Sequence, residues 1–164
     1  YLGVIRMFLK DVYRPEFIKV NLEAEDKDEV FEELVDHFCN ASGIKARQPI
    51  LKAIQEREAK MSTGIKKGIA IPHGKTNAVD QVCGVLGISR KGIDYDALDG
   101  NPVHLLFLIL APEKDSETHL RLLKRLAALL DDPQFYTELA LQSGAQDACE
   151  IIKKYEDILT AATH

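Results

Sequence analysis

The chain has 164 residues, which is the length of one ordinary domain. Hydrophobic residues make up 46% of the chain and charged residues 29%, which is typical of a soluble globular protein. The formal net charge of −5 argues against binding to nucleic acid, and no apolar run approaches the roughly 20 residues of a membrane-spanning helix, so we expect no membrane insertion.

Three cysteines, Cys39, Cys83 and Cys149, are scattered along the chain, and each lies beside apolar residues. Their odd number and wide spacing favour reduced, buried thiols over a disulfide framework or a metal site. Residues 1–9 are too few for a secretory signal peptide and lack its cleavage pattern. Together these features favour a cytoplasmic location.

The first third of the chain predicts an arm, a strand and a helix. Residues 1–15 carry apolar residues at irregular helical spacing, which indicates either a short helix or a loosely docked N-terminal arm. Residues 17–22 predict a short strand. The acidic run at 23–28 is expected to be the solvated start of a helix over 27–41, because carboxylates are favoured at the positive end of a helix dipole.

A second helix is predicted over residues 49–61, beginning at a proline. Its apolar stripe comprises Ile50, Ile54, Arg57 and Met61, at spacings of four, three and four. An arginine on such a stripe must either reach past the helix end or meet an anionic partner. A cation near the helix C-terminus is also favoured by the dipole, so both interpretations stay open on the residues alone.

The most informative stretch is residues 62–75, STGIKKGIAIPHGK. A short β-branched run at 69–71 leads into Pro72, which removes a backbone donor and ends the strand. Gly74 permits a sharp turn or a close backbone approach. His73 is therefore expected to be an exposed imidazole at the end of a buried strand, in a stiff frame.

Two further strands are predicted in the middle of the chain. Residues 79–88 are rich in apolar residues and precede a turn signal at Lys91-Gly92 and a loop at 94–100. Residues 103–111 are apolar apart from His104. A run of this length without polar alternation is typical of a central strand that is covered on both faces.

The last third predicts helices. A strong amphipathic helix covers 117–130, with His119 on its apolar face, and two more cover 133–142 and 146–159, followed by frayed residues at 160–164. Alternating strands and helices predict an α/β fold, in which one domain has a small mixed β-sheet flanked by helices.

His73 suits a nucleophile or a ligand. An imidazole with an ordinary pKa of about 6.5 is mostly neutral at pH 7, so one ring nitrogen already carries a lone pair that can attack a phosphoryl group. The other ring nitrogen must be held by a hydrogen bond so that the correct tautomer faces outward. For a lone histidine after a strand, a structural role is the default alternative.

The other histidines carry weaker signals. His119 lies in the first turn of its helix, where the dipole disfavours protonation and free N–H groups bind phosphate, although a solvated polar residue would look the same. His104 is expected to be a satisfied strand histidine that is at most in a supporting position. His37 and His164 are assigned no function.

The segment MSTGIKKGIAIPHGK resembles the active-site signature of the enzyme IIA domains of the phosphotransferase system, in the fructose, mannitol and nitrogen-regulatory branch. The likeness continues in Tyr95-Asp96-Ala97-Leu98-Asp99, Pro102-Val103, Leu105-Leu106-Phe107, Ala111-Pro112 and Thr118-His119-Leu120. The chain follows the family pattern without large gaps from about Ala24 to Tyr155. Lys66 replaces a usual family glycine, so the loop here is bulkier and more basic.

The resemblance implies that His73 is the residue that is phosphorylated. It implies that Arg57 holds the phosphoryl group by paired charge-assisted hydrogen bonds and that His119 supports the phosphorylated state or the transition state. The residues after the predicted helix are candidates for lining the phosphate pocket: Ser62, Thr63 and Gly64. Lys66 and Lys67 are expected to be solvated loop charges.

The resemblance also implies a function. The small carrier protein HPr donates the phosphoryl group from its phosphohistidine, and sugar-transporting members pass it to a cysteine of a IIB domain, with no metal or cofactor. An apolar rim around His73 is expected, because the docked partner must exclude water. A regulatory module of the nitrogen-related kind, whose phosphorylation state selects its protein partner, is the alternative.

Two other site types are considered. A metal site could be built from His73, His104 and His119, although no ligand spacing supports it. Residues 68–76 end in Gly-Lys-Thr like a P-loop, but five residues separate the glycines where the motif has four. ATP binding by that route is not expected.

Overall fold

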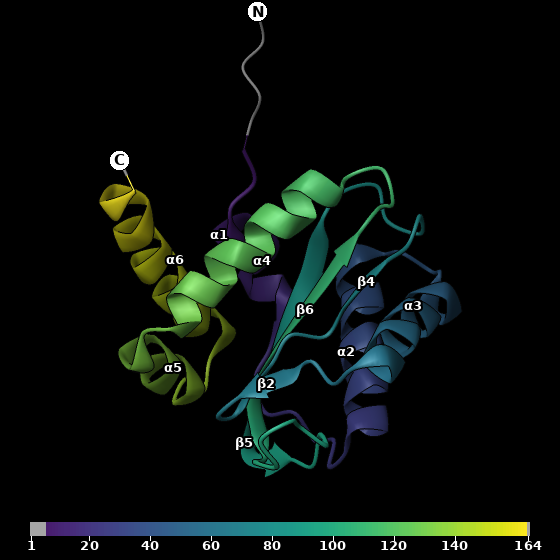
Figure 1. Cartoon of the computed structure of the whole chain (residues 1–164), viewed down its shortest axis with the longest axis horizontal. Helices are drawn as coiled ribbons and strands as arrows, with labels where there is room; N and C mark the ends of the chain where they lie inside the picture. Colours follow the sequence, from purple (N-terminus) through teal and green to yellow (C-terminus); the bar gives the residue numbers. More distant parts are fainter. Residues whose placement is uncertain (1–5, 164) are drawn as a thin grey trace, which may run out of the picture.

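The structure, a computed structural model, describes residues 6–163 (Figure 1). The first five residues of the predicted N-terminal arm, and His164, lie outside these described residues. The helices are α1 (Leu9–Val12), α2 (Lys27–Ser42), α3 (Arg47–Lys60), α4 (Ser116–Leu130), α5 (Pro133–Ala140) and α6 (Ala145–Ala162). The strands are β1 (Ile18–Lys19), β2 (Gly64–Lys66), β3 (Ile69–Ala70), β4 (His73–Lys75), β5 (Cys83–Ile93) and β6 (Val103–Ala111).

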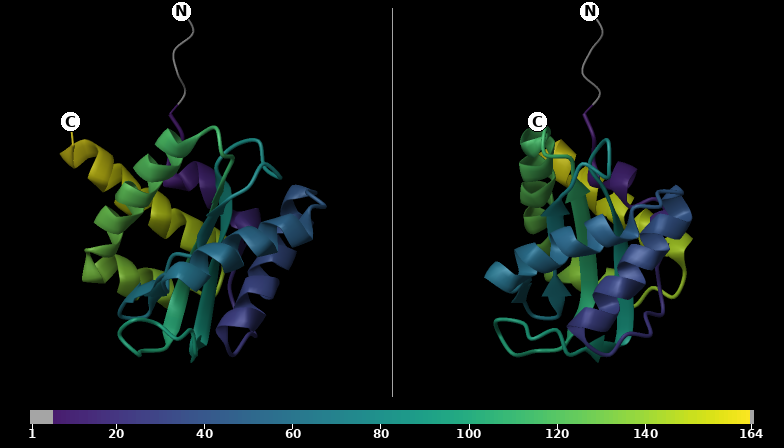
Figure 2. Two further views of the ribbon diagram at one scale, coloured as in Figure 1. Left: turned by 45° about the vertical axis from the view of Figure 1, so that its right-hand side comes forward. Right: turned by 90° about the vertical axis from the view of Figure 1, so that its right-hand side faces the viewer.

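One mixed sheet separates two layers of helices. Its strand order is β1-β5-β6-β3-β2, and β4 also pairs with β6. Helices α2 and α3 cover one face, while α1, α4, α5 and α6 lie on the other (Figure 2). The predicted single α/β domain with a small mixed sheet is therefore confirmed. Within the described part of the chain, no helix is long and apolar enough to cross a membrane.

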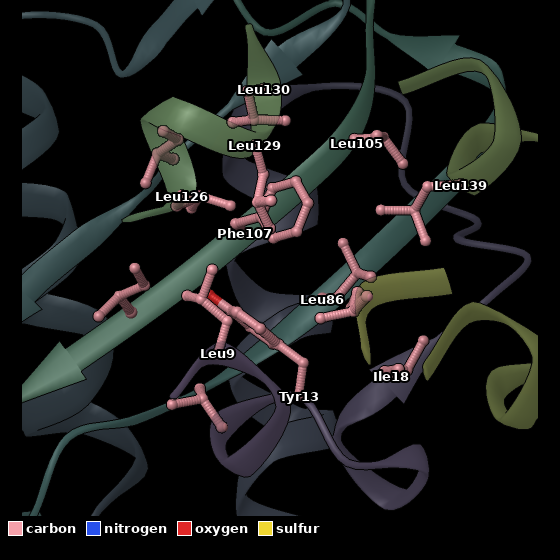
Figure 3. Close-up of a cluster of buried hydrophobic side chains, with 14 of the residues drawn as sticks. Leu9, Tyr13, Ile18, Leu86, Leu105, Phe107, Leu126, Leu129, Leu130 and Leu139 are labelled. Carbon is pink, nitrogen blue, oxygen red and sulfur yellow. The ribbon is translucent and has the colours of Figure 1, made fainter. Parts of the chain in front are cut away.

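Strand β6 is the centre of the sheet and is buried on both faces, as its nearly continuous apolar run predicts. Its side chains alternate between two cores, because successive residues of a strand point to opposite faces. Leu105 and Phe107 pack with α1 and α4–α6, beside Tyr13 (Figure 3). Leu106 and Leu108 pack with α2 and α3.

The strand predicted at 69–71 is shorter than expected and resumes after Pro72. Strand β3 pairs in parallel with β6 through Ile69 and Leu105, and β4 pairs in parallel with the same strand through His73 and Ile109. The Pro72 carbonyl accepts a hydrogen bond from the Ile109 N–H at 3.0 Å, which keeps the chain beside β6. The predicted turn at Gly74 is therefore wrong, because Gly74 lies inside β4.

Gly74 is required for close packing between β4 and α3. A Cβ atom at this position would lie 3.0 Å from the carbonyl carbon of Ala53 and 3.1 Å from its oxygen. Both contacts involve backbone atoms, which cannot move aside as a side chain does.

We expect Gly74→Ala to lower the free energy of unfolding by about 1–3 kcal/mol, because the added methyl group forces β4 away from α3. Urea denaturation measures this change. Gly100→Ala is a poor control, because Gly100 has a φ of +73°, where alanine is itself strained. Ala78→Gly, a small change outside the strands and helices, serves as the comparison. Unchanged stability of Gly74→Ala would contradict the proposed fit.

The strand predicted at 79–88 is displaced along the chain. Residues 79–82 form turns, and β5 begins at Cys83 and continues through the predicted turn to Ile93. A register shift between Ile88 and Ile93 absorbs the turn residues. Gly92 has a φ of +86° there and donates its N–H to Ser89 Oγ, so the glycine marks a bulge within one strand.

The helices nearest the two ends of the described residues, α1 and α6, settle two of the predictions. Of the two alternatives for the N-terminal residues, the structure has a short helix, α1, and its residues Leu9 and Val12 are buried with Tyr13 in the core. Helix α6 continues to Ala162, so the predicted fraying from residue 160 is wrong for the described residues.

The remaining differences are small. The strand predicted at 17–22 is shorter than expected, because only Ile18–Lys19 form a strand, β1, after a 3-10 turn at Pro15–Phe17. All three cysteines are free, but Cys39 and Cys83 are half-buried, and only Cys149 is buried as predicted. Burial raises the pKa of Cys83 to about 12, which keeps this thiol protonated.

Candidate active site

Three elements that are distant in the sequence meet around one pocket of about 670 Å³. Strand β4 supplies His73 and Lys75, α3 supplies Arg57 and Lys60, and the first turn of α4 supplies His119. His73 and Lys75 lie on the same face of β4 because they are two residues apart, and Gly74 between them faces α3. The structure thus brings together His73, Arg57 and His119, which sequence reasoning had singled out separately.

The backbone determines the tautomer of His73. Its Nδ1 lies 2.8 Å from the Ile71 carbonyl oxygen, two residues earlier. A carbonyl oxygen only accepts hydrogen bonds, so Nδ1 carries the proton and Nε2 carries the lone pair of the neutral ring. The side chain is half-buried, not exposed as predicted. Pro72 and the Ile71 carbonyl together hold this ring in one orientation.

The surroundings keep His73 neutral. Burial lowers its pKa below the ordinary value, the Ile71 carbonyl opposes this shift, and the positive charge of Arg57 reinforces it. The neutral form is the nucleophilic one, because protonation removes the lone pair of Nε2. Burial and the arginine therefore both favour the reactive state at pH 7.

His119 is buried, with 5% of its surface exposed. Its ring packs edge-on against that of His73, with the centroids 5.6 Å apart and the planes at 70°. Within residues 6–163 its Nε2 has no hydrogen-bond partner. Burial, followed by the nearby His73 and Lys75, lowers the pKa of His119 to about 4. A buried ring nitrogen without a partner costs free energy, which a bound group with hydrogen-bonding capacity would recover.

Arg57 is half-buried beside the pocket, and its Nη1 donates to the Met61 carbonyl at 2.9 Å. Among the described residues, no carboxylate lies within ion-pair distance of its guanidinium group. The predicted stripe of α3 is partly wrong. Met61 is 60% exposed, and the buried residue of the last turn is Glu58.

Glu58 is the residue near this site that sequence reasoning missed. It follows Ile50 and Ile54 at spacings of four, so the same periodicity could have found it. The candidate phosphate-binding residues lie beyond it and do not line the pocket: Ser62, Thr63 and Gly64. Thr63 donates its N–H and its hydroxyl to Glu58, and Gly64 packs against Tyr95.

The other histidines lie elsewhere. The Nδ1 of His104 is 2.8 Å from the Ser89 carbonyl, near the opposite end of β6 from His73. No group of three potential ligands among residues 6–163 is placed to hold a metal ion, so the alternative site of three histidines is wrong. His37 contacts the Glu16 carbonyl through Nε2 at 3.0 Å, on the surface.

Lys66 has a defined contact in the loop that usually carries a glycine. Its Nζ lies 2.8 Å from Asp131 Oδ1, with both side chains exposed. An exposed pair of this kind contributes only about 0–1 kcal/mol to stability. Lys66 is therefore paired within the protein, although it was expected to be free in solvent.

We expect the imidazole of His119 to titrate near pH 4 and that of His73 below pH 6.5. Below pH 6.5 the unfolded chain takes up protons at these histidines before the folded chain does. Stability is therefore full above pH 6.5 and falls as the pH falls towards 4, by on the order of 1–2 kcal/mol for His119 at pH 5.

Nitrogen-15 NMR titration of the histidine rings checks the midpoints, and urea denaturation at pH 7 and pH 5 checks the stability. His119→Gln should reduce the loss of unfolding free energy between pH 7 and pH 5. A His119 midpoint near 6.5 would contradict the buried, unpartnered geometry.

Comparison with known proteins places this geometry in a family. The chain is 41% identical over 140 residues to the fructose-specific EIIABC component of Bacillus subtilis; the match covers 85% of this chain but only 22% of that longer protein. It is 33% identical over 140 residues to a nitrogen regulatory protein of Bradyrhizobium diazoefficiens, covering 85% of this chain and 91% of the relative. The crystal structure of the nitrogen regulatory protein IIA-Ntr from Neisseria meningitidis superposes with a TM-score of 0.81 at 28% identity, covering 88% of this chain and 98% of that one.

The family model described as "Phosphoenolpyruvate-dependent sugar phosphotransferase system, EIIA 2" matches residues 11–155. This range contains β4, α3 and α4, the elements that form the pocket. The resemblance seen in the sequence is thereby confirmed, and the chain belongs to the EIIA 2 family of the phosphoenolpyruvate-dependent sugar phosphotransferase system.

Proposed function

We propose that this chain is a cytoplasmic phosphocarrier that accepts a phosphoryl group from phospho-HPr on His73 and passes it to a cysteine of a IIB domain. The observation that carries the proposal is the state of the His73 ring. Its Nδ1 is bound to a carbonyl and its Nε2 is left with a lone pair in a pocket that also contains Arg57 and His119. This is the arrangement that a nucleophilic imidazole requires.

The transfer follows from this tautomer. The lone pair of His73 Nε2 attacks phosphorus, and the P–N bond to the donor histidine breaks, with its electron pair returning to the donor ring. Nδ1 keeps its proton, so the phosphorylated ring carries a positive charge that the Ile71 carbonyl stabilises at 2.8 Å. The same positive charge makes the ring a good leaving group when a IIB thiolate attacks phosphorus in the second step.

Arg57 and His119 are proposed to hold the phosphoryl oxygens. The guanidinium group has no carboxylate partner within residues 6–163, so its charge is available to an anion. The unpartnered Nε2 of His119 lies beside His73 and can donate to a phosphoryl oxygen when it carries the ring proton. Phosphoryl transfer depends mainly on such positioning and on charge stabilisation.

An apolar rim is proposed to receive the partner protein. Met61 is 60% exposed and lies next to the Arg57 hydrogen bond, while Leu120 is 54% exposed and follows His119. Large exposed apolar side chains close to two residues of a polar pocket suit a docking surface. A partner seated on them would exclude water, which otherwise hydrolyses the phosphohistidine.

A regulatory role is the second candidate. It is favoured by likeness, because the chain is 33% identical to a nitrogen regulatory protein of Bradyrhizobium diazoefficiens and superposes on the nitrogen regulatory protein IIA-Ntr with a TM-score of 0.81. In that role His73 would still accept the phosphoryl group, and its phosphorylation state would select a protein partner. The fate of the phosphoryl group separates the two candidates.

The test is intact-mass analysis of the chain after incubation with phosphoenolpyruvate, enzyme I and HPr. A gain of one acid-labile phosphoryl group supports the phosphocarrier proposal, and no gain with a competent HPr overturns it. Purified fructose-type and mannitol-type IIB domains are then added. Loss of the group to a IIB cysteine supports the transport role, and retention of the group supports the regulatory one.

A further inference from the structure

A buried carboxylate lies directly beside Arg57 in the sequence and is not part of the pocket. Glu58 is at the C-terminal end of α3, and its side chain is surrounded by Lys27, Thr63 and Tyr95. We call these four residues the Glu58 cluster. They come from α2, α3, the segment before β2 and the loop that follows β5, so the cluster joins four parts of the chain.

Both oxygens of Glu58 are satisfied. Oε1 accepts from Thr63 Oγ1 at 2.6 Å and from the Tyr95 hydroxyl at 3.1 Å. Oε2 accepts from the Thr63 N–H at 2.8 Å and lies 3.1 Å from Lys27 Nζ. Burial raises the pKa of Glu58, but the hydrogen bonds from Thr63 and Lys27 outweigh this effect and leave the pKa lowered. The carboxylate is therefore charged and has no capacity for a further strong donor.

The members of the cluster are themselves firmly held. Tyr95 is fully buried, and its ring packs edge-on against Phe31 with centroids 5.9 Å apart. Lys27 Nζ lies 4.8 Å from the centre of the Tyr95 ring, so the lysine is held by the ring as well as by the carboxylate. The cluster is thus a rigid anchor for the turn between α3 and β2.

This anchor has two consequences for Arg57. Neighbouring residues on a helix point about 100° apart, so Glu58 faces the core while Arg57 faces the pocket. The turn that Glu58 holds through Thr63 also contains Met61, whose carbonyl accepts from Arg57 Nη1 at 2.9 Å. Lys27 satisfies the charge of Glu58, so this carboxylate does not pair with the arginine and neutralise it.

We propose that Glu58 is a positioning residue for phosphoryl transfer, because it fixes the α3–β2 turn from which Arg57 faces His73 and keeps the arginine free for the phosphoryl group. The inference rests on the proposed function, since it concerns the rate of the same transfer. It assigns Thr63 to this anchor, where its hydroxyl and its N–H are both engaged by Glu58.

The first test compares wild type with Glu58→Gln in phosphoryl transfer from phospho-HPr, measured by rapid quench and expressed per folded molecule. The amide presents a donor to groups that are themselves donors, so the turn loses its anchor. We expect kcat to fall at least about tenfold with KM for phospho-HPr nearly unchanged, because displacing a positioned group costs up to ~100-fold. The negative charge of Glu58 raises the pKa of His73, so the NMR midpoint of His73 should also fall.

Two further variants complete the test. Glu32→Gln removes an exposed carboxylate that pairs with Arg47, away from the pocket, and should transfer at the wild-type rate. Tyr95→Phe removes one hydroxyl from the cluster with little change in shape, and should lower kcat by about three- to tenfold even where Glu58→Gln fails to fold. A purely structural role for the cluster would lower the unfolding temperature without changing kcat per folded molecule.

The outcomes are distinguishable. If the wild-type protein is not phosphorylated, both the proposed function and the positioning role of Glu58 are overturned. If the wild-type protein is phosphorylated while Glu58→Gln, or Tyr95→Phe where Glu58→Gln does not fold, transfers at the wild-type rate, only the positioning role is overturned.

Discussion

Replacing His73 with alanine is expected to abolish phosphorylation of the chain by phospho-HPr. The substitution removes Nε2, the ring nitrogen that the Ile71 carbonyl leaves with a lone pair. His119 is not expected to take over, because its side chain is buried, with 5% of its surface exposed. Intact-mass analysis should show one added phosphoryl group in wild type and none in His73→Ala.

The control is His37→Ala, which removes a half-buried histidine of α2 that bonds to the Glu16 carbonyl and does not line the pocket. This variant should gain the phosphoryl group at the wild-type rate. His73→Ala should remain folded, since the side chain is half-buried at the pocket and not in either apolar core. Continued phosphorylation of folded His73→Ala would show that another residue is the acceptor.

The second large effect is expected from Arg57. Arg57→Ala should lower the rate of phosphoryl transfer by about 10²- to 10³-fold, because removing one charge-stabilising donor from a preorganised site costs this much. Arg57→Lys should fall between alanine and wild type, since lysine keeps the charge but loses the planar fork that binds two phosphoryl oxygens. Rapid-quench measurement of transfer from phospho-HPr gives the three rates.

The pH dependence of Arg57→Ala is a second readout. The positive charge of Arg57 lowers the pKa of His73, so its removal raises that pKa. Near pH 6 a larger fraction of His73 is then protonated and unreactive, and the deficit relative to wild type should grow as the pH falls. Arg90→Ala is the matched control, because Arg90 is exposed, donates to the Leu141 carbonyl and does not line the pocket. Equal rates for Arg57→Ala and Arg90→Ala would contradict the proposed role.

Several features of this protein could be predicted from the sequence because they are local. The run at 103–111, apolar apart from His104, is typical of a strand covered on both faces, and β6 is that strand. The side chains of Asp26 and Asp115 accept hydrogen bonds from backbone N–H groups at the starts of α2 and α4, close to where the sequence predicts these helices to begin. Proline before His73 and a carbonyl two residues earlier suffice to orient the imidazole.

Errors arose where tertiary packing overrides local pattern. Pro72 was expected to end the strand and Gly74 to permit a turn or a close backbone approach. The chain instead continues as β4, because β6 offers a further row of hydrogen bonds, and the close approach at Gly74 is to the backbone of α3. Lys91-Gly92 was expected to be a turn, but β5 continues past it because pairing with β6 extends to Val103. In each case the residues predicted to form a turn stay extended because they pair with the neighbouring strand β6.

The sequence by itself determined the proposed nucleophile, His73, and its frame, because the histidine, the proline before it and the carbonyl that binds it are within three residues of one another. Only the tertiary structure decided which charged groups surround that nucleophile. His119 reaches His73 because α4 begins where β6 ends beside β4, and Arg57 faces the pocket because Glu58 is held by Lys27, Thr63 and Tyr95. Periodicity records which side of an element is buried, but the partner that buries it is set by how the elements pack.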